Sequence, residues 1–255
     1  MWEVCPIPED VQSNSGGLRV WLREVIVQSH FFPLFAALVI LLFFVLPVVG
    51  SKGDPGFLVN LFVVTTFVVS LRAIASNRRM MRVIVLLAVP MFAARLWVQI
   101  SAEPLALIVY AGLSIAFLGT VLLVCLSRVL DSSPVNEDKI LGAICVYLLI
   151  GVIFSFVYEI NYIIDPTAID LGEEIQHSEA RHEFWVFTYF SFVTLTTLGY
   201  GDVLPLAPFA RSMATLEAIV GPLYLAILIA RLVSLADAEA PSRRTPVDSR
   251  KPADP

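Results

Sequence analysis

The chain has 255 residues, of which 58% are hydrophobic and only 15% are charged. A water-soluble domain of this length needs more polar surface, so the composition excludes that class and indicates a protein of the lipid bilayer. The net charge is −5, and the three cysteines, Cys5, Cys125 and Cys145, are too few and too badly spaced for a disulfide framework or a zinc site.

The N-terminal segment, residues 1–30, is predicted to lie in the cytoplasm. Apolar residues recur in it at helical spacing (Leu18, Trp21, Leu22, Val25 and Ile26), which predicts an amphipathic helix over 18–28 on the inner membrane surface. Alternatively, this helix simply extends the first membrane span inward.

Membrane spans are predicted wherever about 20 mainly apolar residues follow one another, because that length of helix crosses a hydrocarbon core of roughly 30 Å. Six segments qualify: 31–49, 57–75, 83–98, 104–126, 140–164 and 212–235. The third is the shortest and is expected to bend around Pro90. The first four form a predicted four-helix domain over 31–130.

The basic residues fix the orientation of these spans, since Lys and Arg accumulate on the cytoplasmic side. Of the 17 Lys and Arg residues, all but Lys52, Arg95, Arg181 and Arg211 fall on one side if the N-terminus is inside. Both termini are therefore expected in the cytoplasm of a multi-pass cell-membrane protein. The tail, 236–255, is rich in Pro, Ser, Asp and Arg and is predicted to be disordered.

The segment between the fifth and sixth spans, 161–208, begins acidic and then becomes apolar over 184–198. This apolar run is too short to cross the bilayer and return. It predicts a re-entrant helix that enters from outside, stops midway and climbs back as extended chain. Such backbone is tolerated only where protein or a water-filled cavity satisfies its polar groups.

The sequence TLTTLGYGDV, residues 194–203, follows this half-length helix. A dehydrated cation in the membrane needs oxygen ligands, and a ring of backbone carbonyls supplies them without full charges. Successive carbonyls that point the same way demand alternating backbone geometry, which glycine adopts freely because it has no Cβ. Gly199 and Gly201, on either side of Tyr200, meet this need.

The run Thr197-Leu198-Gly199-Tyr200-Gly201 resembles the Thr-Val-Gly-Tyr-Gly selectivity filter of potassium channels, with Leu in place of Val. The resemblance implies that K⁺ binds the carbonyls of Thr197, Leu198, Gly199 and Tyr200 and the Thr197 hydroxyl. Because the motif occurs once, it also implies a homotetramer around a four-fold axis.

Other residues are predicted to support the filter: Thr196, Asp202, Tyr189, Phe190 and Glu217. The family often carries paired tryptophans where this chain has Tyr189 and Phe190. Glu217, one to two turns into the last span, is costly in the bilayer unless paired. We hypothesise that it bonds hydroxyls or backbone of the pore helix; the alternative is an outer-end residue that reaches water.

The last span contains Gly221-Pro222, and Gly221 matches the family's hinge glycine in its distance from the filter. Both residues weaken a helix, so we predict a gating hinge. Alternatively, small residues there merely allow close packing. The predicted pore domain, 139–235, comprises an outer helix (140–164), an acidic turret (165–183), a pore helix (184–196), the filter (197–201) and an inner helix (212–235).

The first four spans resemble the voltage-gated superfamily in number only. A voltage sensor needs several basic residues at every third position of the fourth span, and 104–126 has none. We therefore expect little voltage dependence. Arg95, near the outer end of the third span, is expected to reach the surface or pair with Glu103.

The sequence thus predicts an all-α membrane protein with six transmembrane helices, a re-entrant pore helix and a filter loop. The expected function is passive K⁺ conduction, with membrane lipids and identical subunits as partners. No enzyme activity, nucleic-acid partner or cofactor other than the permeant ion is expected. The alternatives are a non-selective cation channel, a non-conducting regulatory pore subunit and an ion-coupled transporter.

Overall fold

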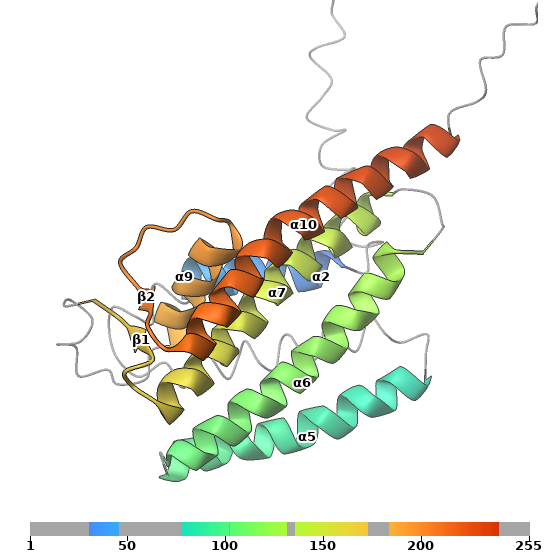
Figure 1. Cartoon of the computed structure of the whole chain (residues 1–255). Helices are drawn as coiled ribbons and strands as arrows, with labels where there is room; N and C mark the ends of the chain where they lie inside the picture. The colour runs from blue at the N-terminus through green and yellow to red at the C-terminus, as the bar shows by residue number, and fades with distance from the viewer. Residues whose placement is uncertain (1–30, 46–77, 102, 132–135, 173–183, 240–255) are drawn as a thin grey trace, which may run out of the picture.

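The computed structural model describes residues 31–45, 78–101, 103–131, 136–172 and 184–239 (Figure 1). Five predictions lie partly or wholly outside these ranges: the amphipathic helix, the end of the first span (46–49), the second span (57–75), most of the acidic turret (173–183) and most of the tail. The described chain is mainly helical, with two very short strands.

Four of the described helices are long and apolar enough to cross a membrane: α5 (Arg78–Ser101), α6 (Pro104–Val129), α7 (Glu137–Ile164) and α10 (Pro208–Glu239). The first predicted span begins as α2 (Phe32–Ile40) and continues as a π-helical turn, η2 (Leu41–Val45). The predicted helix around Pro90 is present, and α5 continues through that proline. The length and apolar composition of these helices indicate a membrane protein.

Two of the three helices of the predicted pore domain, α7 and α10, begin earlier than apolar character alone predicts. Asn136 caps α7 by accepting a hydrogen bond from the Lys139 amide at 3.0 Å, and Glu137 and Asp138 form an acidic first turn. Acidic residues near a helix N-terminus are favoured by the helix dipole. Pro208 occupies the first position of α10, where its missing amide hydrogen costs nothing.

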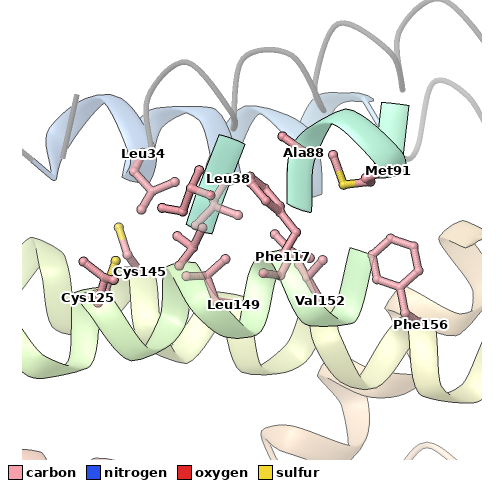
Figure 2. Packing of buried hydrophobic residues seen from close by; sticks show 14 of the residues in the cluster. Leu34, Leu38, Ala88, Met91, Phe117, Cys125, Cys145, Leu149, Val152 and Phe156 are labelled. Carbon is pink, nitrogen blue, oxygen red and sulfur yellow. The ribbon is translucent and has the colours of Figure 1, made fainter. Parts of the chain in front are cut away.

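The main hydrophobic core lies where α2, α5, α6 and α7 meet (Figure 2). Leu34 and Leu38 of α2 are fully buried, as is Leu149 of α7, and Phe117 of α6 is nearly so. Because these side chains come from helices on both sides of the predicted domain boundary, the four-helix part is packed directly on α7.

A second core cluster joins α7 to the short helix α9 (Phe184–Leu195), which also packs on α10 (Figure 1). The rings of Tyr158 and Phe190 lie 4.7 Å apart between centroids, and those of Tyr162 and Phe187 lie 5.4 Å apart. This aromatic packing fixes the start of α9 beside the end of α7.

A two-stranded antiparallel pair, β1 (Ile169–Asp170) and β2 (Leu204–Pro205), ties the segment after α7 to the segment before α10. The amides of Leu206 and Ala207 both donate to the Ala168 carbonyl, at 2.8 and 3.1 Å. The predicted turret therefore begins as an ordered clasp, a feature that its acidic composition does not reveal.

At the opposite end of the bundle, α10 is attached to α6. The Arg231 guanidinium donates through Nη2 to the carbonyl of Leu130, the residue that caps α6 at its C-terminus. Elsewhere α10 is poorly covered, since only 11% of its span is buried, against 50% for α7. Its exposed face is apolar and includes Leu216, Ile219, Leu223 and Ile227.

Candidate functional site

The candidate site is built on the C-terminal end of α9. This helix has 12 residues, a length of about 18 Å at 1.5 Å per residue, roughly half a hydrocarbon core. Its last residue, Leu195, abuts Gly221 near the middle of α10. Its carbonyl also accepts a long hydrogen bond, 3.4 Å, from the hydroxyl of Tyr147 in α7. The C-terminal end of α9 therefore lies level with the middle of α7 and of α10.

The chain turns sharply after Leu195 because its amides fold back onto the end of α9. The amides of Leu198 and Gly199 both donate to the Val193 carbonyl, at 2.9 and 3.3 Å, and the Thr197 amide donates to the Thr194 carbonyl at 2.9 Å. The Thr196 hydroxyl donates to the Phe192 carbonyl at 2.7 Å. In these hydrogen bonds the amides of the turn are paired with carbonyls of α9.

Residues 197–201, here called the filter segment, follow this turn. Within the described part of the chain, no hydrogen bond ends on a carbonyl of the filter segment. Positive φ angles occur at alternate positions: 58° at Thr197, 57° at Gly199 and 78° at Gly201. Such alternation turns successive amides to one side and successive carbonyls to the other. Rows of carbonyl oxygens can coordinate a dehydrated cation.

The filter segment is exposed along its whole length in the single chain. Tyr200 is 68% exposed and Leu198 is 55% exposed. Directly after it, Asp202 accepts a 2.6 Å hydrogen bond from the Tyr189 hydroxyl, so these two predicted support residues are brought together. This bond ties the far end of the filter segment back to α9.

Asp165 caps the C-terminal end of α7 on the same side as the β-strand clasp. The hydroxyl and amide of Thr167 donate to its carboxylate at 2.7 and 2.9 Å. These hydrogen bonds hold the pKa of Asp165 below its usual value, so the negative charge persists as the pH falls toward the ordinary carboxylate range. A persistent negative charge at this end attracts cations, weakly at physiological ionic strength.

Glu217 of α10 lies fully buried behind α9 and makes two short hydrogen bonds. The Ser191 hydroxyl lies 2.5 Å from Oε1, and the Tyr158 hydroxyl donates to Oε2 at 2.6 Å. Ser191 also lies 2.7 Å from the Gly151 carbonyl of α7. The expected bond between Glu217 and a hydroxyl of α9 is therefore confirmed, and the water-facing alternative is wrong.

The other predicted residues take different positions. Phe190 is buried edge-on against the Tyr158 ring, behind the site. Gly221 is buried where a Cβ would lie only 2.1 Å from the Leu195 carbonyl oxygen, and α10 continues through Pro222 without interruption. The structure thus gives Gly221 a packing role; a hinge at Gly221 and Pro222 stays a prediction.

Sequence reasoning did not identify Tyr158, Ser191 or Gly151 as partners of the site. Each is an ordinary residue inside an apolar helix, and none belongs to a recognisable motif. The one signal in the sequence was Glu217 itself, because a carboxylate within a span demands partners.

We expect Glu217→Leu to destabilise the protein strongly and Glu217→Gln to do so only slightly. Leucine leaves the buried hydroxyl of Tyr158 without a partner, at about 1–3 kcal/mol, and removes one of the two partners of the Ser191 hydroxyl, whereas glutamine keeps polar atoms of similar reach. Thermal unfolding in detergent measures the difference. The double variant Tyr158→Phe with Glu217→Leu is the control, and it should recover part of the loss. Equal melting temperatures for the Leu and Gln variants would contradict this role of Glu217.

Residues 142–237, which run from α7 through α10 and include the site, match a family described as "Ion channel". The matched segment is less than half of the chain. No curated protein and no solved structure matches the chain. The family match supports an ion channel rather than an enzyme.

Proposed function

We propose that four copies of the chain surround a central axis and conduct K⁺ passively through the filter segment. The observation that carries this proposal is the alternation of positive φ at Thr197, Gly199 and Gly201, with carbonyls that no described group uses. A single chain offers one wall of oxygens, and an ion without its water shell needs them on all sides.

The exposed apolar face of α10 supports assembly with identical chains. Both this face and the filter segment are exposed in the single chain, and an apolar helix face of this kind is expected to be covered by protein or lipid. Four-fold closure brings both surfaces toward the axis at once. In this arrangement α9 is the re-entrant pore helix, α10 the inner helix and α7 the outer helix, with both termini cytoplasmic.

The proposed channel is largely insensitive to voltage. The fourth predicted span is α6, and Arg128 in its last turn is the one basic residue along the helix. A steep response needs several charges that cross the field, each worth about 2.3 kcal/mol per 100 mV.

Reversal potentials of the purified protein in planar bilayers test the function. With a tenfold K⁺ gradient and Na⁺ as the balancing ion, we expect the current to reverse about 59 mV from zero. Mass measurement of the cross-linked protein should give four subunits. A reversal at zero would instead favour a non-selective cation channel, an alternative also suggested by Leu198 in place of the family's Val. A homotetramer without current would favour a regulatory subunit.

A further inference from the structure

The short helix α9 packs against α7, and the two helices run in opposite directions where they touch (Figure 1). The Tyr147 hydroxyl of α7 reaches the Leu195 carbonyl at 3.4 Å. Gly151 lies four residues later in α7, and its carbonyl accepts a 2.7 Å hydrogen bond from Ser191, four residues earlier in α9. Four residues make about one helical turn, so successive turns of α7 and α9 are paired in one register.

At Gly151 a side chain of α9 lies directly against the backbone of α7. A Cβ at this position would lie 2.7 Å from Cζ of the Phe192 ring, and 2.9 and 3.0 Å from the two adjacent ring carbons, Cε2 and Cε1. The end of the ring therefore points into the space that a side chain at Gly151 would occupy. Rotation of the ring about its own axis leaves Cζ in place, so an added methyl group fits only if the Phe192 side chain or α9 itself moves away.

No neighbouring turn of α7 offers the same space. The residues three or four positions from Gly151 all carry larger side chains: Tyr147, Leu148, Phe154 and Ser155. Residues at these spacings share a helix face, so they are the ones that Phe192 would meet if α9 slipped along α7 by one turn. The same slip would break the hydrogen bond between Ser191 and the Gly151 carbonyl. One residue of α7 therefore specifies the register of α9 twice, through its missing side chain and through its carbonyl.

Phe192 is also the residue to which the turn before the filter segment is attached. Its carbonyl accepts hydrogen bonds from the amide and the hydroxyl of Thr196, at 3.1 and 2.7 Å. The next carbonyl, that of Val193, accepts from the amides of Leu198 and Gly199. The side chain of Phe192 thus contacts α7 while the adjoining backbone holds the start of the filter segment. A displacement of α9 along α7 would therefore carry the filter segment with it.

We propose that Gly151 is a positioning residue that fixes the register of α9 on α7 and thereby the depth of the filter segment in the membrane. Two consecutive residues of α9, Ser191 and Phe192, dock on this one residue of α7. Such a contact is selective because a close-packed interior does not absorb even one extra methyl group without a shift of its neighbours. The consequence for conduction rests on the proposed function, whereas the docking of α9 does not.

Hydrogen–deuterium exchange tests the docking of α9 without any need for current. The Leu198 and Gly199 amides bond the Val193 carbonyl, so their exchange reports the attachment of the filter segment to α9. For the full chain in lipid nanodiscs, we expect Gly151→Ala to speed the exchange of these amides roughly tenfold, which corresponds to about 1.4 kcal/mol. The physical reason is that the added methyl group overlaps the Phe192 ring and displaces α9.

Gly142→Ala is the matched control. Gly142 belongs to the same helix, and a Cβ there would lie 2.9 Å from two carbons of the Phe31 ring, a similar overlap. Phe31 is the residue that caps the start of α2, so this overlap does not involve α9. A general loss of stability would speed exchange in both variants. Docking at Gly151 predicts that Gly142→Ala leaves the exchange of the Leu198 and Gly199 amides as in the wild type.

Phe192→Leu supplies the complementary change. Leucine is shorter than phenylalanine, so the double variant Gly151→Ala with Phe192→Leu should recover most of the slow exchange that Gly151→Ala alone removes. If Gly151→Ala alone fails to assemble, the double variant should restore assembly. Wild-type exchange in Gly151→Ala, equal acceleration in Gly142→Ala, or no recovery in the double variant would each overturn the inference.

Current measurements on the same samples distinguish the two proposals. If the wild-type protein fails to conduct K⁺ but the variants show the expected exchange pattern, the proposed function alone is refuted. If the wild-type protein conducts selectively while the exchange of Gly151→Ala is unchanged, the positioning role alone is refuted. If both proposals hold, Gly151→Ala should move the reversal potential toward zero, and the double variant should move it back.

Discussion

Gly199→Ala is expected to abolish selective K⁺ conduction. Gly199 has a φ of 57°, and an alanine in the left-handed region costs roughly 1–2 kcal/mol, or about 4–8 kcal/mol over four subunits of one ring. The strain falls on the carbonyls that alternate along the filter segment, so a flipped peptide would remove ion ligands. Reversal potentials and single-channel currents in bilayers measure the loss.

The control is Gly119→Ala in α6, where an added Cβ meets no atom within 4 Å and the backbone is helical. The same substitution there should leave currents unchanged and slightly favour the helix. Since a Cβ at Gly199 also meets nothing within 4 Å, any difference between the two variants comes from backbone conformation. Wild-type selectivity in Gly199→Ala would show that the filter segment does not bind the ion through its main chain.

Gly221→Ala is expected to destabilise the protein by about 1–3 kcal/mol per subunit or more, the cost of overpacking a close contact. A Cβ at this position would lie 2.1 Å from the Leu195 carbonyl oxygen and 3.1 Å from its carbonyl carbon. The backbone atoms of Leu195 cannot relieve this overlap by a rotamer change, as a flexible side chain could. α10 must therefore move away from the end of α9, and the melting temperature and the stability of the oligomer should both fall.

Pro222→Ala distinguishes packing from hinge motion. Pro222 is exposed and lies inside the same continuous helix. If α10 bends during opening, both substitutions should change the open probability, because both stiffen the helix. If close packing is the role of Gly221, Pro222→Ala should keep the melting temperature or raise it, while Gly221→Ala lowers it. A Gly221→Ala protein as stable as the wild type would refute the packing role.

Much of the helical architecture could be predicted because lipid imposes a length and a composition on each span. Helices over 104–126 and 140–164 were predicted within a few residues of their observed bounds. The starts of α7 and α10 were missed because Asn136, Glu137 and Pro208 are not apolar: these ends are set by capping and by proline geometry. The strand pair β1–β2 was missed because it has only two residues in each strand.

The filter segment was predicted from a local motif, but its surroundings depend on contacts that are distant in sequence. The bond between Tyr158 and Glu217 joins residues 59 positions apart, and that between Ser191 and Glu217 joins residues 26 apart. Periodicity shows which residues share a helix face, yet it does not say which helix covers that face.

The hydrogen bond between Arg231 and the Leu130 carbonyl opposes any movement of α10 that would widen the proposed pore. This end of α10 is the one farthest from α9, where an inner helix has the most room to swing. For α10 to swing outward, either the hydrogen bond to the terminal carbonyl of α6 must break or α6 must move together with α10. The free energy needed to open the proposed pore then depends partly on how tightly α6 packs against its neighbouring helices. Lipids that change this packing would shift the opening equilibrium without contacting the ion path.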